Sequence, residues 1–274
     1  MGAWLRDRLP ERVDVAALLA DGRFVRDDLT PVAEADPYTP HTFVWFHRDL
    51  PAEVEAPGEI VLIHRDERLV VVDKPAFLSS IPRGQHVRQS VVVRLRDELG
   101  LPELSPLHRL DRITSGLLLL ATERRWRGPY QSMFQAGTVT KTYGALAPVR
   151  ADLEVPVTVR NHIAKRRGSW QAEVVPGAPV NAETLVELES QEGATGRYRL
   201  TPRTGRTHQL RVHLAGLGIP ILDDPLYPAV RDVPVDDFST PLQLLAQEVS
   251  FTDPIDATDR TFRSSLTLPL RAAD

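Results

Sequence analysis

The sequence contains no cysteine, which excludes disulfide bonds, thiolate nucleophiles and cysteine–zinc sites. It also lacks any apolar run near the roughly 20 residues that span a bilayer. The first residues, MGAWLRDRLPERVD, lack the apolar core of a secretory signal. We therefore expect a cytoplasmic protein without a membrane anchor.

Lysine is also scarce, since only 3 of the 33 basic residues are Lys. The net charge of −4 argues weakly against a polyanionic partner, but the charges are unevenly distributed. Residues 61–222 hold 23 basic and 15 acidic side chains, whereas residues 1–60 hold 6 and 12 and residues 223–259 hold 1 and 9. A basic middle is typical of a nucleic-acid surface. A genome rich in arginine codons is the alternative explanation.

The composition predicts one large domain with a small appendage. A hydrophobic content of 42% over 274 residues is enough for a sizeable core. The stretch PAEVEAPGE (51–59) has the Pro, Gly and Glu content of a linker, so we place an appendage at 1–57 and the main domain at 58–274.

Hydrophobic periodicity predicts an α+β main domain with a large, mostly antiparallel or mixed β-sheet, flanking helices and a cleft. Strands are expected in 60–74, 117–120, 138–149, 183–191 and 196–203, and helices in 89–100, 124–137 and 206–218. Within 206–218, His208 and Arg211 are expected on a face opposite Leu210 and Leu214. The appendage has a helical pattern at 14–24 and a strand pattern at 42–46.

The stretch HRLDRITSGLLLLA (108–121) places Asp111 between Arg109 and Arg112, just before a strand that reads as buried on both faces. Asp111 taken alone is most often a turn former. A guanidinium in contact with it would instead hold it ionised. An ionised, desolvated carboxylate is a competent nucleophile or base without a cofactor. The sequence lacks a phosphate-binding loop, a serine nucleophile elbow and a zinc helix.

Four segments in this order resemble motifs of the RluA branch of pseudouridine synthases. They are VVDKPAFLSSIPRG (71–84), HRLDRITSGLLLLA (108–121), KTYGALA (141–147) and TGRTHQLRVHLAGLGIPILDDPLYP (204–228). The resemblance implies base flipping of a uridine in ribosomal RNA, most of all of the large subunit, or in transfer RNA, and its isomerisation to pseudouridine. It implies no metal, no organic cofactor and no obligatory protein partner, and a monomeric enzyme.

The resemblance also implies residue roles. Asp111 would be the catalytic carboxylate, attacking C1′ or abstracting the C2′ proton, and Arg211 would keep it ionised. Tyr143 would stack on the flipped uracil or help to remove its C5 proton. Arg109 would fill the space that the base leaves, and Leu210 would wall the uracil pocket. Further substrate contacts would come from His108, Thr114, Gly116, Lys141, Arg206, His208, Lys165, Arg166 and Arg167.

Two positions depart from the family pattern, and both put the RNA target in doubt. Phe77 stands where Gly is common after Lys-Pro, and Asp223 stands where Gly often precedes the Asp before the Tyr. The N-terminal segment faintly resembles the small alpha-L RNA-binding module, in an acidic and degenerate form. Two rival functions are a catalytically silent, chaperone-like RNA-binding protein and a hydrolase that acts on nucleosides through Asp111.

Overall fold

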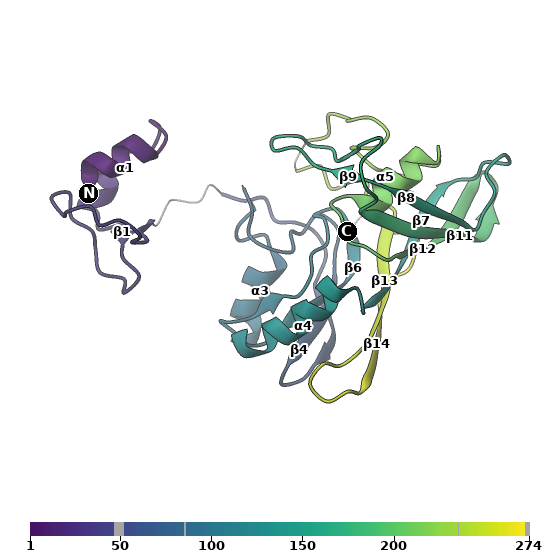
Figure 1. Cartoon of the computed structure of the whole chain (residues 1–274), viewed down its shortest axis with the longest axis horizontal. Helices are drawn as coiled ribbons and strands as arrows, with labels where there is room; N and C mark the ends of the chain where they lie inside the picture. The colour runs from purple at the N-terminus through teal and green to yellow at the C-terminus, as the bar shows by residue number, and fades with distance from the viewer. Residues whose placement is uncertain (47–51, 85, 235, 272–274) are drawn as a thin grey trace. The chain divides into compact units, whose positions relative to one another are not determined.

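Two units make up the chain, Met1–Ala52 and Glu53–Asp274 (Figure 1). The structure is a computed structural model that describes residues 1–46, 52–84, 86–234 and 236–271. Within these residues, no helix combines the length and the apolar character needed to cross a bilayer.

The N-terminal unit is built from two short helices and a two-stranded antiparallel ribbon. Its elements are α1 (Gly2–Arg8), α2 (Val15–Ala20), β1 (Phe24–Val25) and β2 (Trp45–Phe46). The Asp14 side chain caps α2 by accepting a hydrogen bond of 3.0 Å from the Ala17 amide, which satisfies one of the free amides of the first turn. The helical pattern at 14–24, for which Gly22 is the expected stop, corresponds to α2, which ends at Ala20, and Phe24 lies in a strand and in the unit's core.

A mixed sheet forms the larger unit, as the sequence predicted. Its strand order is β3 (Val61–Arg65), β4 (Leu69–Lys74), β6 (Ser115–Ala121), β13 (Leu244–Thr252), β7 (Thr140–Pro148), β12 (Thr195–Pro202), β11 (Ala182–Glu192) and β8 (Val157–Asn161). β5 (Ser105–Pro106) pairs with β6, β14 (Asp259–Arg263) pairs with β13, and β9 (Ile163–Ala164) forms a separate hairpin with β10 (Glu173–Val174). β6 and β13 are parallel, and the other pairs are antiparallel.

Three helices cover the two faces of this sheet (Figure 1). α3 (Val91–Leu99) packs on Leu118 and Leu120 of β6, and α4 (Arg124–Ala136) packs on Leu117 and Leu119 from the opposite face. The leucine strand is thus buried on both faces, which confirms the prediction for 117–120. Full burial of each leucine contributes roughly 1.5–3 kcal/mol. α5 (Gln209–Gly216) packs on β7, β11 and β12.

A row of register partners crosses five strands and ends near the candidate site. It runs from Lys74 to Gly116, Ala246, Tyr143 and Leu200. Partners in such a row point to the same face of a sheet, here the face that α3 and α5 cover. At Gly116 the φ angle is +105° and a Cβ atom would lie 2.4 Å from the Ala246 carbonyl oxygen, so only glycine fits. Lys74 and Tyr143 therefore point to the same face of the sheet.

Both faces of the first part of α5 are buried, since residues 209–214 are all buried. Neighbouring strands satisfy the polar side chains that are buried in this way. Gln209 donates to the Glu183 carbonyl and to the Thr184 hydroxyl, and His213 bonds to Thr184 and Asn161. Burial lowers the pKa of His213 to about 4, so the ring is neutral at neutral pH.

The segment 53–57 lies with the larger unit, whereas the sequence placed the boundary at 57/58. The Glu53 carboxylate accepts hydrogen bonds of 2.8–3.0 Å from the amides of Val87, Arg88 and Gln89. Burial raises the pKa of Glu53, but these three bonds outweigh it and lower the pKa below its usual value. The Ala56 amide donates to the Gln89 side chain at 3.2 Å. The composition of this segment is typical of a linker, but the segment is hydrogen-bonded to the larger unit.

A comparison of two truncated chains tests this boundary. We expect residues 53–274 to unfold at a higher urea concentration than residues 58–274, because the shorter chain loses the carboxylate that bonds three amides. The expected difference is about 1–3 kcal/mol in the free energy of unfolding. Glu53→Gln in the longer chain is the control and should give part of the loss. Equal stability of the two chains would contradict the role of Glu53.

Candidate active site

Asp111 lies in a turn that the fold fixes on both sides. The Thr114 amide donates to the Asp111 carbonyl at 3.1 Å, and β6 begins at the next residue. The Ser80 hydroxyl donates to the Leu110 carbonyl at 2.8 Å and accepts from the Leu110 amide at 3.1 Å. The Asp111 backbone thus forms the turn that its residue type favours, while its side chain, 31% exposed, is free for another contact.

That contact is a buried ion network centred on Arg211. Nε and Nη2 of Arg211 donate to the two carboxylate oxygens of Asp224, both at 2.7 Å, and Nη1 donates to Oδ2 of Asp111 at 3.2 Å. The side chains of Arg211 and Asp224 are 2% and 0% exposed. The amides of Leu226 and Tyr227 also donate to Asp224. Asp224 therefore fixes the guanidinium, and the remaining nitrogen faces Asp111.

The charges of this network support an ionised Asp111. Burial lowers the pKa of Arg211, but the two carboxylates outweigh burial and leave the pKa above its usual value. Arg211 is consequently a permanent cation that faces both carboxylates, and Asp111 is the more exposed of the two.

His208 forms the wall of the site next to Asp111. Its Nε2 lies 3.9 Å from Oδ2 of Asp111, and its Nδ1 lies 3.0 Å from the hydroxyl of Tyr227. Burial lowers the pKa of His208 to about 4, so the ring is neutral at pH 7 and leaves Arg211 as the cation that pairs with Asp111.

Tyr227 links the ion network to the β9–β10 hairpin. Its ring lies under the Arg211 guanidinium, with the Cζ atom 5.2 Å from the ring centroid. Its hydroxyl accepts a hydrogen bond of 2.6 Å from the Ala172 amide and lies 3.1 Å from the Ala172 carbonyl oxygen. Burial raises the pKa of Tyr227 to about 12, so the hydroxyl keeps its proton. Tyr227 and Ala172 also share a buried cluster with Ile163 of β9.

Tyr143 and Lys74 reach the site from the cross-strand row. Burial raises the pKa of Tyr143, and the Asp111 carboxylate raises it further, so the ring lies within electrostatic reach of that carboxylate. Nζ of Lys74 donates to the carbonyls of Pro75, Leu78 and Arg112 at 2.8, 2.9 and 3.0 Å. Lys74 thereby ties the end of β4 to the turn that holds Asp111.

The buried Lys74 also affects the charge of the site. Burial lowers the pKa of Lys74 to about 7, and the Asp111 carboxylate opposes this shift. Three carbonyl acceptors match the three donors of an ammonium group, which favours the charged form. When protonated, Lys74 is therefore a second cation near Asp111.

Chemically, the arrangement suits nucleophilic or general-base catalysis by Asp111. Within the described residues, the hydrogen bond to its carboxylate falls on Oδ2, and the side chain remains partly exposed. An aromatic ring, a neutral histidine and a fixed guanidinium surround it. Preorganised groups of this kind hold a charge without rearranging during a reaction. Among the same residues, no group of three or more His, Asp or Glu side chains could hold a metal ion.

Several of the residues predicted to bind the substrate make contacts within the fold instead. His108 accepts a hydrogen bond of 3.2 Å from the Leu119 amide, and its ring stacks on Phe134 of α4 at 4.9 Å. Its pKa falls to about 3, mainly through burial. These contacts place His108 toward the α4 face of the sheet, so we leave it out of the site. Thr114 and Leu210 are 3% and 7% exposed and lie in the packed interior.

The other residues predicted to contact the substrate differ in their exposure and in their contacts. Arg109 and Arg206 are exposed, and Arg206 donates from Nε to the Asn181 carbonyl at 3.0 Å. Gly116 has no side chain to offer and serves the close approach of β6 and β13. Lys141 is half-buried on β7, and burial lowers its pKa. Burial lowers the pKa of Lys165, and the Asp111 carboxylate opposes part of this shift.

Arg112, the residue after Asp111, packs against Phe77. Its guanidinium lies 5.8 Å from the centroid of the Phe77 ring and donates to the Phe77 carbonyl at 3.4 Å. Phe77 and Asp223, the two departures from the family pattern, have left-handed φ angles of +67° and +63°. Glycine adopts this conformation without cost, so both positions keep the backbone of a glycine with another residue. The Phe77 ring also packs on Phe238, with centroids 5.2 Å apart.

The sequence reasoning assigned no role to three residues of the site: Asp224, Tyr227 and Lys74. Asp224 and Tyr227 lie within the quoted segment LDDPLYP, where an acidic pair interrupts an apolar stretch. Lys74 directly follows the apolar strand LVVVD, and a cation at the end of a buried strand needs partners. Those two irregularities were the available signals.

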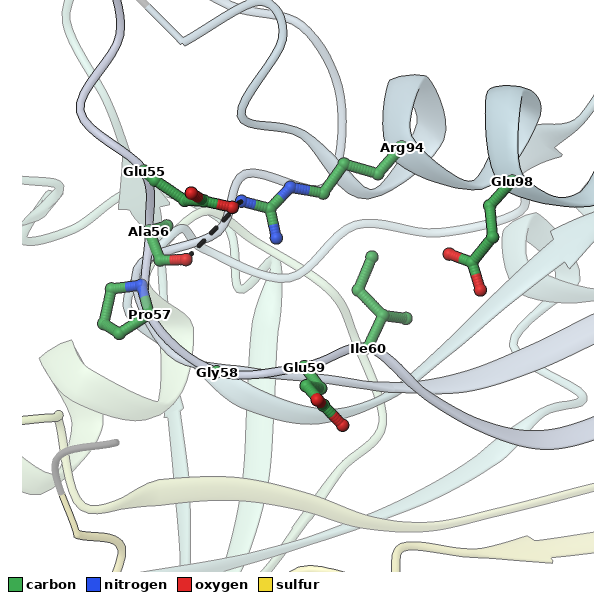
Figure 2. Close-up of a pocket in the computed structure, with 8 residues that line it drawn as sticks. All are labelled: Glu55, Ala56, Pro57, Gly58, Glu59, Ile60, Arg94 and Glu98. Carbon is green, nitrogen blue, oxygen red and sulfur yellow. Dashed lines mark hydrogen bonds and ion pairs between the residues drawn. The ribbon is translucent and has the colours of Figure 1, made fainter. Parts of the chain in front are cut away.

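A separate hollow of about 560 Å³ lies between α3 and the segment 55–60 (Figure 2). Figure 2 shows Arg94 reaching from α3 to Glu55 and to the Ala56 carbonyl, and the ion pair between Arg94 and Glu55 measures 3.7 Å. Glu59 and Glu98 complete an acidic lining that does not suit an anionic ligand. None of the predicted site residues lines this hollow, so the expected cleft at Asp111 stays a prediction.

Comparison with known protein families gives one match that covers more than half of the chain. Residues 68–216 match the model described as RNA pseudouridylate synthase. This range includes Asp111, Tyr143 and Arg211, whereas Asp224 and Tyr227 lie beyond its end.

Individual relatives and solved structures agree with the family match. The chain is 35% identical to RNA pseudouridine synthase 7 of Oryza sativa subsp. japonica over 62% of its length, and it spans only 45% of that protein. It is 30% identical to the dual-specificity RNA pseudouridine synthase RluA of Yersinia pestis, covering 74% of this chain and 98% of that one. The solved structure of human RNA pseudouridylate synthase domain containing 4 is similar, with a TM-score of 0.58, 28% identity and coverage of 76% and 89%.

Asp224→Asn tests the network. The variant keeps the size of the side chain but removes the charge that pairs with the buried guanidinium. We expect the free energy of unfolding to fall by about 3–5 kcal/mol, because a buried ion loses its bidentate partner. Urea unfolding followed by circular dichroism measures the change. Asp223→Asn, one residue earlier, removes the same charge outside the network and should cost less than 1 kcal/mol. Similar losses in both variants would contradict a special role for Asp224.

Proposed function

The chain belongs to the RNA pseudouridylate synthase family, in its RluA branch, and from this premise we propose that it isomerises uridine to pseudouridine in RNA. The observation that carries the proposal is the partly exposed Asp111 carboxylate, held by a buried Arg211 and accompanied by Tyr143. The chain spans less than half of some relatives, so its activity rests on this site and not on the names of those proteins.

The proposed reaction begins with extrusion of the uridine from its helix, because the reacting atoms are inaccessible in a base stack. Asp111 then attacks C1′ or removes the proton from C2′, and the N1–C1′ bond breaks. The base rotates and C5 bonds to C1′, while Asp111 leaves C1′ or returns the proton to C2′. C5 then gives up its proton, and N1 gains one. Substrate and product are therefore isomers, and the reaction consumes no cofactor. Tyr143 stacks on the uracil or assists the removal of the C5 proton.

The network around Arg211 supports this chemistry by fixing charge and position. Asp111 must be ionised to act as nucleophile or base, and Arg211 provides the cation that favours this form. Because Asp224 binds the other side of the same guanidinium, Arg211 cannot follow Asp111 when the carboxylate moves toward the ribose. Lys74 holds the Arg112 carbonyl in the same turn and so limits the movement of the backbone.

The proposed substrate is ribosomal RNA, most of all of the large subunit, or transfer RNA. The proposed enzyme acts in the cytoplasm as a monomer without an obligatory protein partner. Family membership, with Asp111, Tyr143 and Arg211 all present, argues against a silent RNA-binding protein. It also argues against a hydrolase, which would release uracil. We keep the N-terminal unit as a proposed degenerate alpha-L RNA-binding module.

A second proposed element is the basic part of the β9–β10 hairpin. Lys165, Arg166 and Arg167 are exposed and lie next to one another in its tip. Arg166 reaches Glu173 only at 3.7 Å, and both side chains are more than half exposed, so this ion pair contributes little. The three cations are available for the phosphates of an RNA that lies across the site.

Asp111→Asn tests the chemistry. The variant should fold as the wild type does but isomerise uridine at least about 1,000-fold more slowly, because an amide is neither nucleophile nor base here. Nucleoside analysis of a digested RNA transcript measures pseudouridine, and the mass of the RNA should be unchanged. Asp223→Asn is the matched control and should keep near-normal turnover. Normal turnover by Asp111→Asn, or release of free uracil by the wild type, would overturn the proposal.

Replacement of Lys165, Arg166 and Arg167 together by Ser tests the phosphate contacts. Each lost contact should reduce the slope of log affinity against log salt by roughly 0.7–0.9. Affinity at low salt should fall, while turnover at saturating RNA should change much less. The matched control replaces Arg124, Arg125 and Arg127 on α4, which removes the same charge elsewhere. If both triple variants lose the same slope, the hairpin has no special part in binding.

A further inference from the structure

The β9–β10 hairpin carries a tryptophan that the fold does not use. Trp170 lies near the tip of the hairpin, and it is 74% exposed. Exposed indole surface is unfavourable in water, at roughly 25 cal/mol per Å² of apolar area. A large aromatic side chain that packs on nothing in its own fold is typical of a residue that contacts a partner.

The backbone around Trp170 is held, although its ring is free. Nζ of Lys165 donates to the Trp170 carbonyl at 3.0 Å. The Ser169 hydroxyl donates to the Gln171 carbonyl at 2.7 Å and accepts from the Gln171 amide at 3.2 Å. The Gln171 side chain donates to the Leu226 carbonyl. The backbone that carries the indole is therefore held in place, which reduces the entropy lost when a partner binds it.

The position of the hairpin relates the indole to the site. Ala172, two residues after Trp170, is hydrogen-bonded to the hydroxyl of Tyr227, whose ring lies under Arg211. Lys165, at the start of the same tip, lies within electrostatic reach of Asp111, Arg83 and Arg211. The tip thus borders the Asp111 site from the side of Tyr227. Figure 1 shows the hairpin beside α5, which carries Arg211.

The chemistry of the tip matches an unpaired nucleotide. Three cations at residues 165–167 suit phosphate oxygens, and an indole face suits the face of any base. Exposed cations at 165–167 precede the indole in the same tip, and this combination of charge and one large aromatic ring favours RNA over a protein partner. Base stacking on one aromatic ring needs no more than the ring itself.

We propose that Trp170 stacks on an unpaired base of the RNA next to the uridine that Asp111 receives. The inference rests on the proposed function, because it takes RNA as the ligand of this face. It adds a requirement for the substrate: at least one neighbour of the target uridine must be free of a base pair when the RNA is bound.

The test separates base contacts from phosphate contacts. Two fluorescein-labelled RNA probes are used, a 12-nucleotide oligouridylate and a 12-nucleotide abasic backbone with the same charge. Fluorescence anisotropy in 50 mM salt gives the affinity of the full chain for each probe. The variants are Trp170→Ala and Trp170→Phe, with Val180→Ala as a matched control, because Val180 is an exposed apolar residue of the segment that follows β10.

We expect Trp170→Ala to bind oligouridylate about tenfold more weakly and to bind the abasic backbone as the wild type does. Trp170→Phe should keep most of the affinity, and Val180→Ala should change neither probe by more than twofold. The salt slope should be unchanged in Trp170→Ala, in contrast to the triple replacement of the cations. An equal loss on both probes, or no loss on oligouridylate, would overturn the stacking role.

Turnover separates the fate of this inference from that of the proposed function. Trp170→Ala should raise the RNA concentration needed for half-maximal isomerisation by about tenfold, in line with its loss of affinity. If Trp170→Ala leaves the affinity for both probes intact while Asp111→Asn abolishes isomerisation, the function stands and the stacking role falls. If the probes respond to Trp170→Ala as expected but the wild type forms no pseudouridine, the reverse holds.

Discussion

The site depends on one buried guanidinium. Burying a charge in a protein interior costs several kcal/mol unless partners compensate it, and Arg211 finds its compensation in Asp224, at 2.7 Å on two nitrogens, and in Asp111. Arg211 and its two partners come from three places in the chain: α5, the turn that follows α5 and the turn before β6. The charged site therefore exists only when all three segments are assembled, and folding and chemistry share one interaction.

Three residues near this interaction have a backbone conformation that is unfavourable for residues other than glycine. Phe77, His208 and Asp223 all have left-handed φ angles, which cost roughly 1–2 kcal/mol at a residue with a side chain. His208 uses this conformation to place its ring between Asp111 and Tyr227, and Asp223 uses it just before Asp224. Phe77 is the bulkiest of the three, and the packing of its ring on Phe238 and under Arg112 offsets part of the cost.

Sequence patterns predicted the parts of the fold that depend on local periodicity. The leucine strand and α4 appear where 117–120 and 124–137 indicated them, because burial on two faces or on one leaves a clear pattern. α5 misled that reasoning, since His208 and Arg211 look like a solvated face until their partners are known. Those partners, Asp224 and Tyr227, come from a later turn, and no spacing rule links them to Asp111. The motifs predicted that Asp111 and Arg211 act together, but the residue that fixes their geometry required the structure.

The row that crosses the sheet from Lys74 to Leu200 has an evolutionary consequence. Successive residues of a strand point to opposite faces, so a shift of one residue in β7 would turn Tyr143 away from Asp111 and put Thr142 or Gly144 in its place. A deletion in the loops of this protein is thus a small event, whereas a deletion of one codon inside β7 or β13 destroys the site. Gly116, which no other residue can replace beside Ala246, keeps β6 and β13 in this alignment. Relatives are free to diverge in loop length while their strand lengths stay fixed.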